Sequence, residues 1–164
     1  MSSGGISVGA PLGLEIPRIE CRAINRSGGA LAAGNVVMFD LAGTDAAVSA
    51  TDNTVPGATD AGLSNVIAPT DNLAVGVSIL AIALEAIADD ATGRFCVQGR
   101  VTATTSEAVD CGDSLTVDNS SKGLSDTGGV NQGFFAFALE DTSGAGTGQV
   151  LFNGFGFGNQ ASSD

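Results

Sequence analysis

The sequence has no histidine, no tryptophan and no tyrosine. Without histidine, a serine or cysteine nucleophile lacks its usual general base. A zinc site also lacks ligands, because there is no Cys-x-x-Cys pair either. Glycine-rich phosphate loops of the Gly-Lys-Ser/Thr and Gly-x-Gly-x-x-Gly types are missing as well. We therefore predict a protein that is not an enzyme and that holds no metal ion or cofactor.

Basic residues are scarce. Six lysines and arginines stand against 18 aspartates and glutamates, so the formal net charge is −12. A nucleic-acid-binding protein needs a basic face to neutralise phosphates, and docking on anionic lipid needs basic segments for the same reason. We expect neither nucleic acid nor membrane as a partner.

The charges are unevenly distributed along the chain. Residues 1–26 hold Arg18, Arg22 and Arg26 against two acids, whereas residues 27–93 hold eight acids and no base. A slightly basic leading segment followed by an acidic body indicates that the two parts face different surroundings. The three arginines are therefore candidates for contact with an acidic partner surface.

Cysteine is rare and its count is odd, the three being Cys21, Cys96 and Cys111. A disulfide framework favours an even number, so we predict buried or half-buried free thiols in a protein made in a reducing cytoplasm. The first residues lack the charged and apolar regions of a signal peptide. The apolar stretch Leu73–Ala88 contains Glu85 and is short for a membrane span, so we interpret it as a buried strand.

The chain repeats itself at two offsets. Residues 30–40 match residues 108–118 at an offset of 78, and residues 81–85 match residues 136–140 at an offset of 55. The second match continues, because Thr92-Gly93 falls on Thr147-Gly148. Repetition of this kind is typical of scaffolds assembled from copied β units.

Alternation of polar and apolar residues predicts strands. Residues 97–104 place Val97, Gly99, Val101 and Ala103 on one face and polar residues on the other. Arg18–Ala23 also alternates, although Arg18, Arg22 and Arg26 have helical i,i+4 spacing after Pro17. The offset of 78, which lays Arg22 on Arg100, favours a strand. Further strands are expected in segments rich in β-branched and small residues: Val36–Asp40, Val75–Ala88, Arg94–Val101, Ser114–Asp118, Phe134–Glu140 and Gln149–Phe157.

These elements predict one compact all-β domain, a tulip-like sandwich or barrel built from two similar halves. We expect a flexible N-terminal arm over residues 1–17 because of its glycine, serine and proline content. The β domain spans residues 18–158, with halves at 18–96 and 97–158, and residues 159–164 form a disordered tail. The first half contains a long loop without regular structure, Leu41–Asn72.

Two pairs of carboxylates occupy matching places in the repeat: Glu85 with Glu140, and Asp40 with Asp118. Paired acids can hydrolyse glycosides. The repeat alone explains their pairing, however, and strand-end acids are commonly satisfied by caps or by arginine. Loop residues with oxygen ligands suited to calcium form a further candidate, without a recognised spacing: Asp52, Asn53, Asp60, Asp71, Asn72, Asp89 and Asp90.

Phenylalanine gathers near the end of the chain, where six of the eight lie between positions 134 and 157. Phe155 and Phe157 are predicted to share one face of a strand. Two interpretations remain open for this segment. Its rings belong to the core, or Phe152, Phe155 and Phe157 form a subunit interface, where aromatic residues are enriched.

The phrase Ala108-Val-Asp-Cys-Gly-Asp-Ser-Leu-Thr-Val-Asp118 resembles the strand signature A-[VIL]-x-x-G-D-x-[VL] of tailed-bacteriophage capsid decoration (cement) proteins. Ala74-Val-Gly-Val77 resembles the same family, as does Ala83-Leu-Glu-Ala86 followed by Gly93-Arg-Phe-Cys-Val-Gln-Gly99. The resemblance covers residues 18–158.

This resemblance implies a small, usually trimeric β protein that binds the major capsid protein on the outer surface of the virion, stabilises the shell and catalyses nothing. In this chain, Arg18, Arg22 and Arg26 would then meet acidic capsid surface. The alternative is a secreted or surface adhesion module whose Asp-rich loops bind calcium. A melting scan with and without calcium separates the two, because a ligand that binds only the folded state raises its melting temperature.

Overall fold

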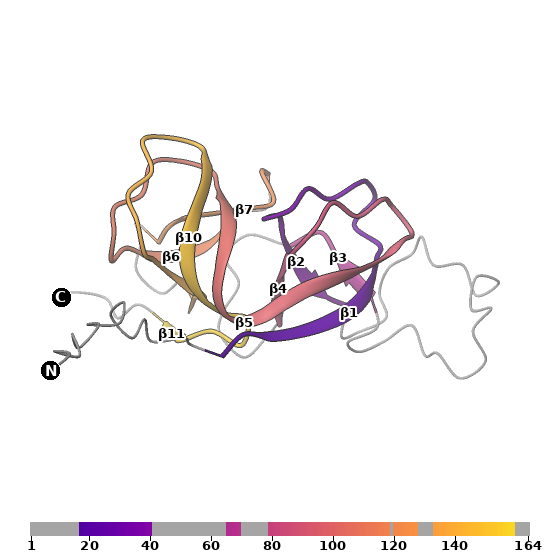
Figure 1. Cartoon of the computed structure of the whole chain (residues 1–164). Coiled ribbons are helices and arrows are strands. Elements are labelled where there is room, and N and C mark those ends of the chain that lie inside the picture. Colours follow the sequence, from indigo (N-terminus) through magenta and orange to yellow (C-terminus); the bar gives the residue numbers. More distant parts are fainter. Residues whose placement is uncertain (1–16, 41–64, 70–78, 119, 128–132, 160–164) are drawn as a thin grey trace, which may run out of the picture.

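The computed structural model describes residues 17–40, 65–69, 79–118, 120–127 and 133–159, and this part of the chain contains strands and no helix (Figure 1). The predicted all-β class is confirmed. The strands are β1 (Ile19–Asn25), β2 (Val36–Phe39), β3 (Asn65–Ile67), β4 (Leu80–Ala83), β5 (Thr92–Thr105), β6 (Ser114–Asp118), β7 (Gly123–Asp126), β8 (Gly133–Phe134), β9 (Ala136–Ala138), β10 (Gly146–Asn153) and β11 (Gly158–Asn159).

Nine of these strands form one mixed sheet in the order β1-β3-β2-β4-β5-β10-β9-β6-β7. Two additional pairings, β1–β5 and β5–β7, close this sheet on itself twice. The result is two rings that lie side by side in Figure 1 and share β5. We call β5-β1-β3-β2-β4 the first ring and β5-β10-β9-β6-β7 the second ring. Strands β8 and β11 form a separate two-stranded sheet.

Strand β5 belongs to both rings because it changes partners half-way. Its first part pairs with β1 as far as Gln98, and its second part pairs with β10 from Gln98 to Thr105. Gly99 stands at the change with φ of 117°, and a Cβ there would lie 2.8 Å from the Cα of Arg18. Only glycine satisfies both constraints. The predicted boundary between the halves, after residue 96, falls inside this continuous strand.

The two rings contain corresponding hydrogen bonds. The Gly34 amide donates to the Ala83 carbonyl at 2.8 Å, and the Gly112 amide donates to the Ala138 carbonyl at 2.9 Å. The donors are 78 residues apart and the acceptors 55, as in the sequence repeat (112 − 34 and 138 − 83). The isolated bridges Leu31–Ile87 and Val109–Thr142 follow the same two offsets.

The first strand departs from the predicted offset of 78. Ala23 pairs with Gly93, and Ala103 pairs with Gly148, so β1 corresponds to β5 at an offset of 80 (103 − 23). The reason is the connection after the strand, which is two residues longer in the first ring, from Asn25 to Leu31, than from Thr105 to Val109. Arg22 therefore corresponds to Thr102 and not to Arg100.

Within the predicted loop Leu41–Asn72, the structure describes residues 65–69, and these include a strand. Asn65–Ile67 forms β3, which runs parallel to β1 and antiparallel to β2 and so closes the first ring. Three residues are too few for an alternation to be recognised. Strand β7 has the same role in the second ring, parallel to β5 and antiparallel to β6.

Two apolar clusters form the core. One contains the inward side chains of the first ring, among them Phe39, Phe95 and Val97. The other contains the inward side chains of the second ring, among them Leu115 and Phe152, together with residues of the first ring that point the opposite way: Val36, Leu80, Ile82 and Cys96. Strand β4 is therefore buried on both faces, and the rings pack directly on each other.

Strand β10 ends at Asn153, earlier than the predicted end at Phe157. The Asn153 side chain accepts a hydrogen bond from the Phe155 amide at 3.2 Å and donates one to the Gly156 carbonyl at 2.8 Å. Gly156 has φ of 84°, and its amide donates to the Asn153 carbonyl at 2.8 Å. Phe155 and Phe157 therefore extend from a turn and not from a strand face.

The predicted arm and tail, residues 1–17 and 159–164, lie outside the described residues except for Pro17 and Asn159. The described part of the chain includes no helix that is long and apolar enough to cross a membrane.

Candidate interaction surfaces

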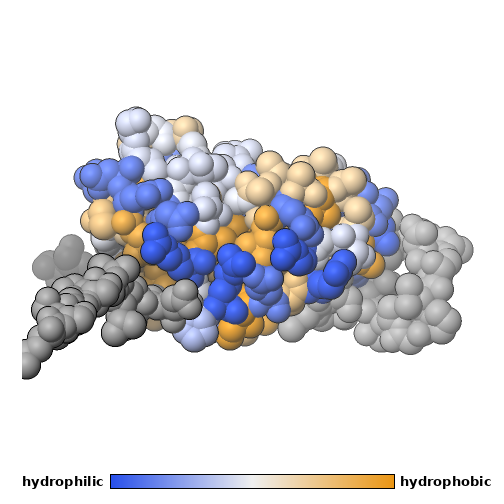
Figure 2. Space-filling model, viewed as in Figure 1, coloured by the Kyte–Doolittle hydropathy of each residue, from blue (hydrophilic) through white to orange (hydrophobic). Residues whose placement is uncertain are grey.

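Four of the six basic residues lie on two neighbouring strands: two on β5, one on β1 and one directly before β1. They are Arg18, Arg22, Arg94 and Arg100, and all four are exposed. We call them the arginine strip. Figure 2 shows that hydrophilic side chains form a band across the side of the molecule on which β1, β5 and β10 run, with hydrophobic side chains beside it. Arg94 and Arg100 were not identified from the sequence, although Arg100 stands at an outward position of the predicted alternation.

The charges of the strip are incompletely compensated. Glu20 pairs with Arg18 at 2.5 Å and with Arg94 at 3.8 Å, and Glu85 pairs with Arg94 at 3.3 Å. Arg22 lies directly opposite Arg94 on the neighbouring strand and has no carboxylate partner among the described residues. Like charges opposite each other destabilise a strand pair, so an acidic partner at this point is electrostatically favoured.

Arg26, the third arginine selected from the sequence, has a different environment. Its Nη1 pairs with the Asp90 carboxylate, and its side chain is only 16% exposed. Asp90 stands in a turn with φ of 61°. Arg26 therefore connects the end of β1 to this turn, and its charge is compensated within the chain.

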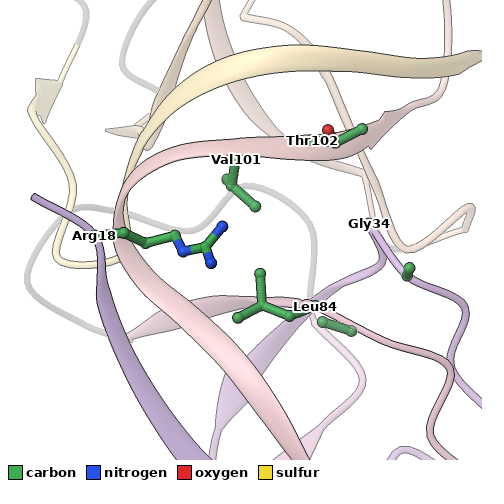
Figure 3. Close-up of a pocket in the computed structure, with 7 residues that line it drawn as sticks. Arg18, Gly34, Leu84, Val101 and Thr102 are labelled. Carbon is green, nitrogen blue, oxygen red and sulfur yellow. The ribbon is translucent and has the colours of Figure 1, made fainter. Parts of the chain in front are cut away.

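A hollow of about 280 Å³ lies beside the bend of β5. Its walls are mainly small or apolar: Ala33, Gly34, Ala83, Leu84 and Val101. The Arg18 guanidinium points into it between Val101 and Leu84 (Figure 3). Thr102 is the other polar residue of the lining. Both polar side chains already have partners, because Arg18 pairs with Glu20 at 2.5 Å and the Thr102 hydroxyl accepts from the Gln149 side chain at 2.5 Å.

Three phenylalanine side chains form a cluster beside the strands of the second ring. Phe157 stacks on Phe134 with centroids 5.9 Å apart and lies 5.0 Å from Phe137, and Phe134 meets Phe137 edge-on at 5.3 Å. Phe155 is 50% exposed and Phe157 40%. Phe134 and Phe137 were not selected from the sequence, although the concentration of phenylalanine after position 134 was the available signal.

Phe152 does not belong to this surface. Its side chain is fully buried in the core of the second ring, because it alternates with outward Leu151 and Asn153 on β10. Of the three phenylalanines predicted at a subunit interface, Phe155 and Phe157 are accessible to a partner. The core interpretation therefore holds for Phe152, and the interface interpretation stays a prediction for Phe155 and Phe157.

The paired carboxylates are satisfied locally. Glu85 accepts from the Arg94 amide at 3.1 Å, Glu140 accepts from the Gln149 amide at 2.8 Å, and Asp118 accepts from Ser120 and Ser121. The bonds from Ser120 and Ser121 hold the pKa of Asp118 below its usual range, and the Ser120 hydroxyl is the largest cause. Asp40 is buried. Glu85, Glu140 and Asp118 are thus satisfied at their strand ends by backbone amides or serine hydroxyls.

Most of the calcium candidates lie outside the described residues, namely Asp52, Asn53, Asp60, Asp71 and Asn72. Asp89 and Asp90 are described and exposed, and Asp90 is paired with Arg26. Among the described residues, no group of three or more histidine, cysteine or acidic side chains is arranged to hold a metal ion.

The three cysteines are free thiols, as predicted. Cys96 is buried and Cys21 is half-buried, as predicted, but Cys111 is exposed. Burial raises the pKa of the Cys96 thiol to about 11 and raises the pKa of Cys21 as well. Cys96 contributes to the packing of the two rings rather than to reactivity.

No family model matches the sequence, and comparison with curated proteins yields no match. Among solved structures, the chain is similar to the head fiber gp8.5 N base of bacteriophage phi29, with a TM-score of 0.54. The two chains share a fold. The similarity covers 84% of this chain and 95% of that chain at 9% sequence identity, so it concerns the arrangement of the strands rather than individual residues.

Proposed function

We propose that this protein is a structural component of a bacteriophage virion, a decoration or cement protein that binds the outer surface of the assembled capsid and stabilises it. The observation that supports this function is the fold shared with a phage head fiber base across almost the whole of that chain. The strand signatures that resemble cement proteins point to the same class independently.

The arginine strip is the surface we propose for the capsid contact. Four arginines stand there against Glu20 and Glu85, within a chain whose net charge is −12. This arrangement attracts an acidic surface on one side and repels it elsewhere, so the charges orient the protein as it docks. Arg22, which has no carboxylate partner among the described residues, would receive an acidic side chain of the major capsid protein.

The proposed site of action is the outer capsid surface, after synthesis in the host cytoplasm. The proposed partner is the major capsid protein, and several copies of this chain, a trimer in the cement proteins it resembles, would bind together. Multivalent attachment makes weak individual contacts sufficient, because each further contact forms at a high effective concentration. No catalytic step is part of this function.

Binding of the purified chain to capsids assembled without it tests the proposal. We expect the variant with Arg18→Ala and Arg22→Ala to bind at least tenfold more weakly at low salt, because two charges leave the contact. The matched control carries Ala145→Glu and Ser143→Glu, which shift the net charge equally at exposed loop positions away from the strip. This control should bind like the parent chain.

Equal binding of the strip variant and the parent would remove the arginine strip from the contact. Failure of the parent chain to bind any capsid would refute the function itself. Deletion of residues 1–17 tests the contribution of the leading segment separately, and we expect that deletion to weaken binding as well.

A further inference from the structure

Corresponding rows of side chains cross the two rings. In the first ring, β-sheet pairing connects Val36 to Ile82 and Ile82 to Cys96. In the second ring, it connects Ser114 to Phe137 and Phe137 to Leu151. The members correspond one by one at offsets of 78, 55 and 55 (114 − 36, 137 − 82 and 151 − 96). Both rows point away from the interior of their own ring.

The two rows differ in what covers them. Val36, Ile82 and Cys96 have no exposed surface, because they pack into the core cluster of the second ring. Phe137 and Leu151 are only half-buried. The outward face of the first ring is thus an apolar face covered by another ring, and its counterpart on the second ring lacks such a cover within the described part of the chain.

Apolar side chains surround the open row. Phe134 and Phe157 lean over Phe137, and Leu139 and Phe155 are 39% and 50% exposed. We call these residues the aromatic patch: Phe134, Phe137, Leu139, Leu151, Phe155 and Phe157. It contains no charged side chain, although the chain has 24 of them. Large aromatic residues grouped in this way are typical of the centre of a protein interface.

We propose that the aromatic patch binds a second copy of this chain. The charges at its border support this occupant. Glu85 in the first ring forms an ion pair with Arg94 at 3.3 Å. At the offset of 55, Glu85 corresponds to Glu140 in the second ring, and Arg94 corresponds to Gln149. Gln149 keeps the backbone hydrogen bond to Glu140 at 2.8 Å but supplies no cation.

A cation lies at the border of the patch on β5, beside Gln149. Arg100 pairs with Leu151 across β5 and β10 and donates to the Gln149 side chain at 3.2 Å. Neither Arg100 nor Glu140 forms an ion pair among the described residues. The patch therefore has one uncompensated cation and one uncompensated anion at its edges. Arg100 of one copy facing Glu140 of the next satisfies both, and it offsets part of the repulsion between two chains of charge −12.

The test uses the full chain without capsids, so its outcome is independent of the proposed capsid binding. Light scattering across micromolar concentrations should give a mass above that of the monomer, and a dimer or a closed ring both support the proposal. Leu139→Ser with Phe157→Ser should raise the dissociation constant at least a hundredfold, because two central apolar contacts are lost. Circular dichroism confirms that this exposed-residue variant is folded.

Charge exchange makes the test specific. Arg100→Glu and Glu140→Arg should each weaken self-association about tenfold, and the two together should restore it. Lys122→Glu, which changes the charge as much as Arg100→Glu outside the patch, should associate like the parent chain. A parent chain that stays monomeric, or a double variant without recovery, overturns the proposal. Patch variants that still self-associate but lose capsid binding also overturn it and assign the patch to the capsid.

Discussion

Gly154 lies against Leu80 at the point where the two rings meet. The Leu80 amide donates to the Gly154 carbonyl at 2.9 Å, and the Gly154 amide donates to the Val97 carbonyl at 2.8 Å. A Cβ at position 154 would lie 2.1 Å from the Leu80 carbonyl oxygen and 3.0 Å from that of Val97. The absence of a side chain at this residue allows β4, β5 and the end of β10 to approach one another.

Gly154→Ala is therefore expected to destabilise the protein strongly. The added methyl group meets backbone atoms, which cannot turn away as a side chain would, so we expect a loss of about 3 kcal/mol. Gly144→Ala is the matched control, because a Cβ there meets nothing within 4 Å, and it should change stability by less than about 0.5 kcal/mol. Denaturant unfolding of both variants measures the difference, and equal stabilities would contradict the close approach.

Asn25→Ala should also be costly, because Asn25 is a buried polar side chain with every bond made. It donates to the carbonyls of Gly29 at 2.8 Å and Ala88 at 3.1 Å and accepts from the Ser27 amide at 3.0 Å. Its removal takes the partner from these part-buried groups and from the buried Ile87 carbonyl, which Asn25 also reaches at 3.3 Å, at a cost of about 2–3 kcal/mol.

Thr105→Val tests the corresponding position in the second ring. Thr105 corresponds to Asn25 at the offset of 80 that relates β5 to β1. The Thr105 hydroxyl is buried and has no hydrogen-bond partner among the described residues. A methyl group of the same size leaves no bond broken, so valine should match threonine or stabilise the fold by up to about 1 kcal/mol. A loss as large as that of Asn25→Ala in the same unfolding assay would show that the hydroxyl is paired.

Thiol modification should separate the three cysteines. At pH 8 in the native state, we expect Cys111 to react first, Cys21 slowly and Cys96 not at all, since burial both blocks access and raises the pKa of Cys96 to about 11. In denaturant all three should react. Mass spectrometry after timed alkylation checks the order, and early labelling of Cys96 in the folded chain would contradict the packing of the rings.

Stability in acid should depend on Asp118. Its pKa is lowered in the folded state, mainly by the hydrogen bond from the Ser120 hydroxyl. A lowered folded pKa contributes stability above the unfolded value near 4, and that contribution disappears as the pH falls through the folded value. Asp118→Asn should therefore be less stable than the parent at pH 7, with the gap closing below pH 4. Thermal melts across that range measure the gap, and a gap that does not change with pH would exclude the ionisation of Asp118 as its source.

Strand positions were largely predictable, because alternation and turn residues are local properties. Ser114–Asp118 was predicted with its observed bounds, and Val36–Asp40 differs from β2 by one residue. β3 and β7 were missed because three or four residues carry no recognisable periodicity. The predicted strand Val75–Ala88 is a strand only over Leu80–Ala83 in the described part of the chain. The end of β10 was misplaced because the Asn153 side chain, a tertiary and turn-specific feature, stops the strand.

The candidate surfaces were predictable only in part. Arg18, Arg22, Phe155 and Phe157 were selected from charge and aromatic content, and all four are exposed. Arg26 and Phe152 shared those signals and are not available to a partner, one because of Asp90 and the other because of the core. Asp90 is far from Arg26 in the sequence, and the core residues around Phe152 come from several strands, so no local sequence pattern predicts these contacts.

The sequence by itself determined the all-β class, the corresponding strands and the absence of histidine chemistry, because composition and periodicity act through local backbone preference. Only the tertiary structure decided that one strand serves two rings and that the outward row of the first ring is covered while its counterpart is open. An alternating pattern reveals that a face is apolar, but what covers that face depends on contacts between residues far apart in the chain.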